Sequence, residues 1–217
     1  MSEVEQNASD VEAGRKRYVS KRGRFEIKAN PAMQPTMKGG NELTTEFDVT
    51  ALAETVGEEA ARQKVEEMMQ AVAPGISENV LFSQNTDGGM SLVHIWFGPN
   101  LPLFRHSHPW YGDCLYYVAA GEIIMGRRHL GPGSVFFIPN GHPYKYSAGP
   151  EGAEVLEFRA GGGEPNQPKM RIDERTLSSV QSIIDTAKAN QPRWKRPDGF
   201  GDTGHVKSAG PEEETRA

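Results

Sequence analysis

The sequence predicts an all-β core, folded as an antiparallel sandwich or barrel, with flanking N- and C-terminal helices. Residues 79–160 hold short apolar runs rich in Val, Ile, Tyr, Phe and Trp, and turn signals such as Asp87-Gly88-Gly89 and Gly131-Pro132-Gly133 separate them. The segments on either side show apolar residues at helical spacing instead. Many short strands without helices between them are typical of all-β domains.

Composition and charge bound the classes of function. The chain has 217 residues, enough for one domain with a sizeable core. Its net charge of −5 argues against general affinity for nucleic acid or for an anionic membrane surface. No apolar run reaches the roughly 18 residues of a membrane span, and the acidic N-terminus lacks a secretory signal. Cys114 is the one cysteine and has no internal disulfide partner, so we expect a reducing, cytoplasmic location.

The segment before the barrel is predicted to contain an arm and a helix. Residues 1–46 carry few large apolar side chains without any period, and we expect a flexible arm. Its basic run from Arg15 to Arg24 could contact an acidic partner or nucleic acid, and we interpret it as solvated. Residues 47–75 are predicted to be a helical brace that ends at Pro74-Gly75. Its core-facing stripe consists of Leu52, Val56, Val65, Met68, Met69 and Val72.

The barrel itself is predicted over residues 76–162. Residues 163–190 are predicted to form a linker and a second helix, which packs against the outside of the sheet and ends before Pro192. Residues 191–217 are polar and punctuated by Gly and Pro, so we expect a flexible tail. The apolar face of the second helix carries Leu177, Val180, Ile183, Ile184 and Ala187.

The most informative residues for chemistry are His106 and His108. Residues i and i+2 of a strand point to the same face, so the two imidazoles lie side by side and can chelate a metal. In a closed barrel the shared face is the interior, where an unpaired imidazole is costly unless it meets a hydrogen-bond partner or a metal. The pattern alone fits a hydrogen-bonded pair equally well.

Two motifs in order resemble those of the cupin superfamily. His106 and His108 match the paired histidines of the first motif, and Gly121 matches its last glycine. Gly133, Pro139 and Gly141 match the second motif at its proper spacing. The resemblance covers roughly residues 98–160. It implies a small jelly-roll barrel, the cupin double-stranded β-helix, with a metal usually held by three His and one Glu.

Three positions depart from the family pattern. Asn100 stands where the first motif begins with Gly, and the Glu position falls on Cys114 when counted from Gly121 but on Asp113 when counted from His108. A shift of one residue reverses the face of a strand, and the spacing favours Cys114 as the inward residue, with Tyr116 and Val118 on its face. Asp113 reaches a metal only if a bulge or the turn at Gly112 redirects it. The third histidine position is Tyr144, while His142 lies two residues earlier.

These departures leave several ligand sets open. His106 and His108 with Asp113 suit Fe(II), whereas a set with His142 is compatible with Fe(II), Zn or Ni. A Cys114 thiolate favours Zn or Cu, although we expect this residue to be a small core filler. Aromatic residues that could wall a substrate pocket are Trp110, Tyr111, Tyr116, Tyr144 and Tyr146, of which Tyr144 could donate a hydrogen bond to substrate. The remaining histidines, His94, His129 and His205, are left outside the site.

Two classes of function follow. The first is a metal-dependent enzyme, most plausibly a mononuclear non-haem iron oxygenase such as a dioxygenase, acting on a small cyclic or carbonyl-bearing metabolite. The second is a non-catalytic cupin with an eroded metal site that only binds a small molecule, and a metal-dependent lyase or isomerase is a further alternative. Retention of both histidines favours the first class, and Cys114 with Tyr144 favours the second. The resemblance also implies a homodimer.

Overall fold

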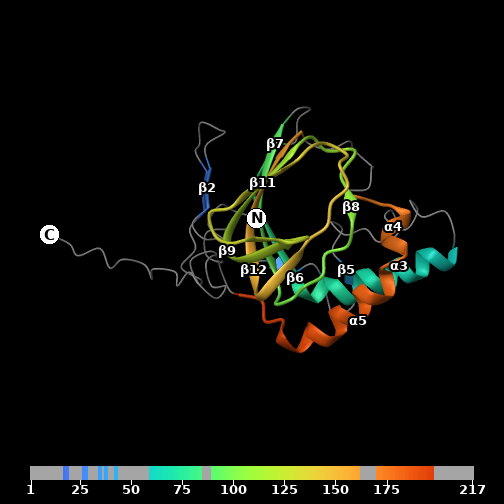
Figure 1. Cartoon of the computed structure of the whole chain (residues 1–217). Helices are drawn as coiled ribbons and strands as arrows, with labels where there is room; N and C mark the ends of the chain where they lie inside the picture. Colours follow the sequence, from blue (N-terminus) through green and yellow to red (C-terminus); the bar gives the residue numbers. More distant parts are fainter. Residues whose placement is uncertain are drawn as a thin grey trace.

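The computed structural model describes residues 17–19, 26–28, 34–35, 37–38, 42–43, 59–84, 89–161 and 170–197. Antiparallel strands curve into a barrel, and two helices, α3 (Glu59–Val72) and α5 (Val180–Asn190), lie beside each other along one end of it (Figure 1). The expected all-β core with flanking helices is therefore confirmed. None of the helices in the described residues is long and apolar enough to cross a membrane.

The larger sheet runs in the order β10-β9-β12-β7-β6-β3, and β11 also pairs with β9. Every pairing among these strands is antiparallel. Side chains alternate along β9, so that Cys114, Tyr116 and Val118 are buried while Leu115 and Tyr117 face outward. The strands are β3 (Gln34–Pro35), β6 (Ile76–Ser83), β7 (Met90–Phe97), β9 (Cys114–Met125), β10 (Arg128–Leu130), β11 (Val135–Ile138) and β12 (Ser147–Ala160).

The opposite side of the barrel is shorter and less regular. Here residues 101–107 run antiparallel to residues 144–148, with backbone hydrogen bonds that place His106 directly across from Tyr144. The short strand β8 (His106–Ser107) pairs on its other edge with β13 (Arg171–Ile172). Backbone pairing therefore sets the positions of His106 and Tyr144 relative to each other, independently of their side-chain contacts.

Gly121 shows why the first motif ends in glycine. Its φ of +65° lies in the left-handed region, and a Cβ at this position would be 2.1 Å from the carbonyl oxygen of Gly152. Because Gly152 belongs to β12, the absence of a side chain lets β9 and β12 approach where their register shifts.

The helices match the predicted apolar stripes, with differences at their ends. Val65, Met68, Met69 and Val72 of α3 are buried, and so are Val180, Ile184 and Ala187 of α5. Both methionines therefore belong to the core. The second helix is divided into α4 (Glu174–Leu177) and α5, while the 3-10 turn η2 (Ala73–Gly75) follows α3. Leu52 and Val56 lie outside the described residues.

The two terminal segments contain more structure than their composition indicates. Within the predicted arm, residues 1–46, the described parts are β3 and four short strands, and the rest of that arm lies outside the described residues. At the other end, η3 (Gln191–Arg193) follows α5, and the half-buried Trp194 donates from Nε1 to the carbonyl of Pro99 at 2.9 Å. The start of the predicted tail at residue 191 is thus too early. The four further strands are β1 (Arg17–Val19), β2 (Glu26–Lys28), β4 (Met37–Lys38) and β5 (Glu42–Leu43).

Candidate functional site

Four buried side chains meet at one point inside the barrel. The Nε2 atoms of His106 and His108 each lie 3.1 Å from the hydroxyl oxygen of Tyr144. The hydroxyl of Tyr116 lies 2.6 Å from the same oxygen. We call His106, His108, Tyr116 and Tyr144 the Tyr-His cluster. None of these side chains is more than 6% exposed, so the cluster is shielded from bulk water.

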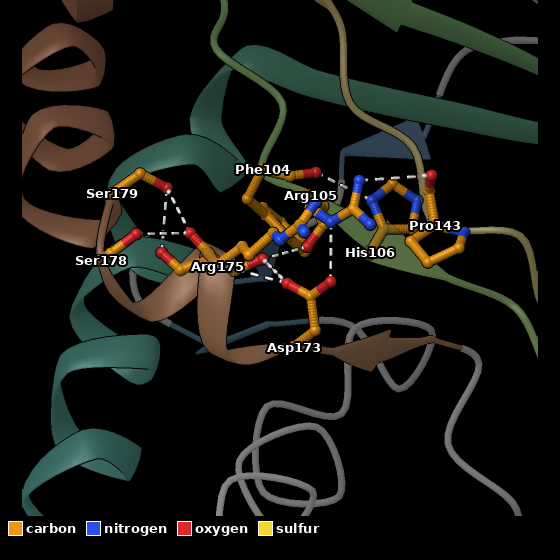
Figure 2. Close-up of polar contacts among 9 residues, drawn as sticks. Phe104, Arg105, His106, Pro143, Asp173, Arg175, Ser178 and Ser179 are labelled. Carbon is orange, nitrogen blue, oxygen red and sulfur yellow. Dashed lines mark hydrogen bonds and ion pairs between the residues drawn. The ribbon is translucent and has the colours of Figure 1, made fainter.

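The hydrogen bonds of the cluster define which atoms carry protons. His106 donates from Nδ1 to the backbone carbonyl of Phe104 at 3.0 Å, which leaves a lone pair on its Nε2 (Figure 2). Tyr144 has one hydroxyl hydrogen and donates it to this lone pair. Tyr116 therefore donates to the oxygen of Tyr144, and His108 donates to it from Nε2. Every hydroxyl in the cluster has a partner in this arrangement.

Burial keeps three members of the cluster neutral. Loss of solvation, together with the neighbouring His108, lowers the pKa of His106 to about 3. Burial also raises the pKa of Tyr116 and of Tyr144 well above 10, and the Glu157 carboxylate adds to both shifts. At neutral pH His106 is an uncharged imidazole and both tyrosines are phenols.

A buried ion pair beside the cluster was missed in the sequence. Glu157 and Arg159 lie on the inner face of β12, across from Tyr116 and Cys114 of β9, and the Nε of Arg159 donates to Glu157. The Glu157 side chain is 2% exposed and that of Arg159 15%. The signal was present: Val155, Glu157 and Arg159 alternate along a predicted strand, so both charges share a face with a core valine.

Two predicted metal ligands are not brought to the cluster. Asp113 is exposed and its Oδ1 accepts a hydrogen bond from the backbone N–H of Asn140 at 2.9 Å. His142 is also exposed, in the turn before the Tyr144 bridge. The turn at Gly112 does not redirect Asp113, so Cys114 is the inward residue, as the spacing to Gly121 predicts. Asp113 and His142 therefore have no support as ligands in this geometry.

The predicted aromatic wall is present in part. Tyr146 is buried and stacks against Tyr144, with ring centroids 6.0 Å apart. Phe136, which sequence reasoning did not single out, stacks on Tyr116 at 4.6 Å. Tyr111 meets His108 edge to face at 6.1 Å, whereas Trp110 is half-buried in the turn after β8. The rings of Tyr111, Phe136 and Tyr146 thus surround the cluster.

A polar clamp holds the strand that carries His106. Arg105 donates from Nε to Asp173 at 2.7 Å and from a terminal nitrogen to the carbonyl of Pro143 at 3.4 Å (Figure 2). Asp173 also accepts the backbone N–H of Thr176 at 3.1 Å and so caps α4. The hydroxyl of Thr176 donates to the backbone carbonyl of Arg105. The clamp links the backbone of β8, the Tyr144 segment and α4.

The two other described histidines lie away from the cluster. His94 is buried on the outer face of β7, where its Nε2 is 2.9 Å from Glu154. His129 is exposed and pairs with Glu122 at 3.1 Å, as expected for a solvated strand end. Both are therefore excluded from the site.

The donor set fits a metal ion only if the phenol is included. Among the described residues, no group of three or more His, Cys, Asp or Glu side chains is arranged to hold a metal. Two donors bound about 2.1 Å from one ion lie roughly 3.0–3.4 Å apart at octahedral or tetrahedral angles. The 3.1 Å separations from Tyr144 to both imidazoles have this spacing. The Nδ1 contact of His106 with a backbone carbonyl is also typical of metal-binding histidines.

Comparisons with solved structures find similar chains. An RmlC-like cupin from Shewanella frigidimarina is 18% identical, with a TM-score of 0.36, over 44% of this chain and 83% of that one. The polyketide cyclase RemF from Streptomyces resistomycificus is 23% identical, with a TM-score of 0.39, over 52% and 83%. KdgF from Halomonas sp. is 23% identical, with a TM-score of 0.35, over 41% and 82%.

The barrel is similar to these cupin structures, and His106-Ser107-His108 has the HxH spacing. No family model and no curated protein matches the sequence.

Proposed function

We propose that the barrel binds a small organic molecule at the Tyr-His cluster, with a divalent metal ion held by His106, His108 and Tyr144. The observation that carries this proposal is the convergence of two Nε2 atoms on one phenol oxygen at equal distance. Binding of a metal by Tyr144 would release its proton, because a phenolate is the better ligand. Tyr116 would then donate its hydrogen bond to the phenolate and stabilise the charge.

The finer proposal is a mononuclear non-haem iron dioxygenase. Bound Fe(II) would make a coordinated substrate oxygen more acidic and would react with O₂. A dioxygenase adds both oxygen atoms to its substrate and needs no separate reductant. The chain would supply flat aromatic surfaces from Tyr111, Tyr146 and Phe136, which suit a planar enol, phenol or diketone.

Metal analysis of protein purified without a His tag tests the site. Replacement of His106 and His108 together by Ala should abolish metal uptake and leave the barrel folded, because the apolar side chains of the core do not include either imidazole. Tyr144→Phe should weaken uptake, since it removes the third donor and keeps the ring. Tyr116→Phe is the matched comparison: it also removes one cluster hydroxyl but no proposed ligand, and should weaken uptake less than Tyr144→Phe does.

Oxygen consumption tests the reaction. The Fe(II)-loaded protein should consume O₂ with at least one member of a panel of diketones and hydroxylated aromatics, and the His106→Ala protein should not. If no member of the panel causes the protein to consume O₂, the dioxygenase proposal is contradicted.

A metal-free binding protein is the second candidate, and one observation favours it. The hydroxyl of Tyr144 already gives both imidazoles a hydrogen-bond partner. These bonds offset the cost of burying the two rings without a metal ion. If the purified protein holds no metal while small ligands raise its melting temperature, this function replaces the first.

A further inference from the structure

The proposed metal site leaves Arg159 unexplained. A charged side chain on the inner face of a barrel strand is costly unless it is paired, and Arg159 lies across from Cys114 on β9 and Ser91 on β7. Replacing a buried ion pair by apolar residues is often neutral or stabilising, so Glu157 and Arg159 are weak evidence for a purely structural role.

The guanidinium uses only one of its edges within the described residues. Its Nε donates to Glu157, and neither terminal nitrogen has a described hydrogen bond. The only fully buried side-chain nitrogen or oxygen without a partner in the described part of the chain is Nε of Arg62. The Arg159 side chain as a whole keeps 15% of its surface exposed to solvent.

Aromatic contacts orient the open edge beside the Tyr-His cluster. The guanidinium carbon lies 5.0 Å from the centre of the Tyr111 ring, which holds the guanidinium plane by a cation-π contact. The same Tyr111 ring meets His108 edge to face at 6.1 Å. Arg159 and His108 of the cluster thus contact the same Tyr111 ring.

We propose that Arg159 binds the carboxylate of a small organic acid and thereby orients the acid over the cluster. Two terminal N–H groups in a fixed plane match the two oxygens of a carboxylate. Glu157 holds the other edge, so the guanidinium is oriented before the ligand arrives. A carboxylate monoanion brings less negative charge beside Glu157 than a phosphate dianion would, so it fits better. This assignment of substrate class rests on the proposed small-molecule function of the barrel.

Paired probes of equal shape test the proposal: benzoate against benzamide, and cyclohexanecarboxylate against its amide. Calorimetry should show each acid binding at least about tenfold more tightly than its amide, the order expected of a charge-assisted pair. Arg159→Lys keeps the charge without the planar edge and should lose most of this preference. Arg127→Gln, at an exposed turn position, is the matched control and should keep it.

Arg159→Gln alone leaves Glu157 buried without its partner and can unfold the barrel, so the double variant Glu157→Gln/Arg159→Gln is included. The preference for acids should be absent from this variant. Equal binding of acid and amide by the native chain, no binding of either acid, or a preference that survives in both variants overturns the proposal. Metal content separates it from the proposed function: acid preference in a protein that takes up no metal supports Arg159 and contradicts the metal site.

Discussion

Cys114 faces the barrel interior, and its surroundings suppress its reactivity. Burial raises the pKa of the Cys114 thiol to about 12, and the negative charge of Glu157 adds to the rise. The thiol makes a long contact, 3.8 Å, to the carbonyl of Gly112. Because the thiolate is the nucleophile, a thiol with this pKa is inert at neutral pH.

We therefore predict that native Cys114 resists alkylation. Iodoacetamide at pH 8 should leave the folded chain unmodified over an hour, and the same treatment in urea should modify it fully, as measured by mass spectrometry. An Ser178→Cys variant, with a cysteine at an exposed position, is the positive control. Rapid modification of Cys114 in the folded chain would show that the thiol is accessible or ionised.

At the scale of single residues, strand parity was the dependable part of the sequence reasoning. The position of Gly121 correctly placed Cys114 inside and Asp113 outside, because alternation along β9 has a fixed period of two. The inward charges of Glu157 and Arg159 were not predicted, because such residues usually lie outside, although their alternation with Val155 indicated the inner face. The meeting of Tyr144 with both histidines depends on pairing across 36–38 residues.

At the scale of elements, the clamp between Arg105 and Asp173 connects α4 to the strand that carries His106. Burial would raise the pKa of Asp173, but hydrogen bonds from Arg105 and Thr176 outweigh it and hold that pKa below its ordinary value. The folded state thus favours the ionised carboxylate. Its contribution to stability is full above the unfolded pKa, near 3.9, and is lost as the pH falls through the lower folded value.

We predict that Asp173→Ala lowers the free energy of unfolding by about 1–2 kcal/mol at pH 7, because it removes a helix cap together with the partner of Arg105. Urea titration measures this. Asp173→Asn, which can still cap the helix, should cost less. The difference between native and Ala proteins should shrink below pH 3.5. An equal difference at pH 7 and pH 3 would contradict a role for the ionised carboxylate.

Helices with a regular spacing of apolar residues could be predicted from the sequence, whereas short strands that form only by pairing with another strand could not. The stripes of α3 and α5 follow from spacing alone, since 3.6-residue periodicity is local. The two-residue strand β13 exists only because β8 lies beside it, and its own sequence carries no strand signal. The break between α4 and α5 coincides with Ser178 and Ser179, whose hydroxyls bond back to carbonyls of Arg175 and Thr176.

At the scale of the whole molecule, Trp194 joins the C-terminal segment to the end of the barrel. A Cβ on Gly98 would lie 2.4 Å from the indole ring, and one on Gly75 would lie 2.7 Å from it. The ring thus occupies the space that these two glycines leave open. Its N–H bonds to the carbonyl of Pro99, in the turn that follows β7.

We predict that the boundary of the stable unit lies after Trp194. A chain ending at residue 197 should keep the native melting temperature, because the polar stretch beyond it lacks core-forming periodicity. A chain ending at residue 190 should melt several degrees lower, because it loses the packed indole ring of Trp194 and the hydrogen bond that this ring donates. Trp194→Ala in the full chain should reproduce most of that loss, which separates the effect of the ring from that of chain length. Equal melting temperatures for the two truncated chains would show that Trp194 does not close the barrel end.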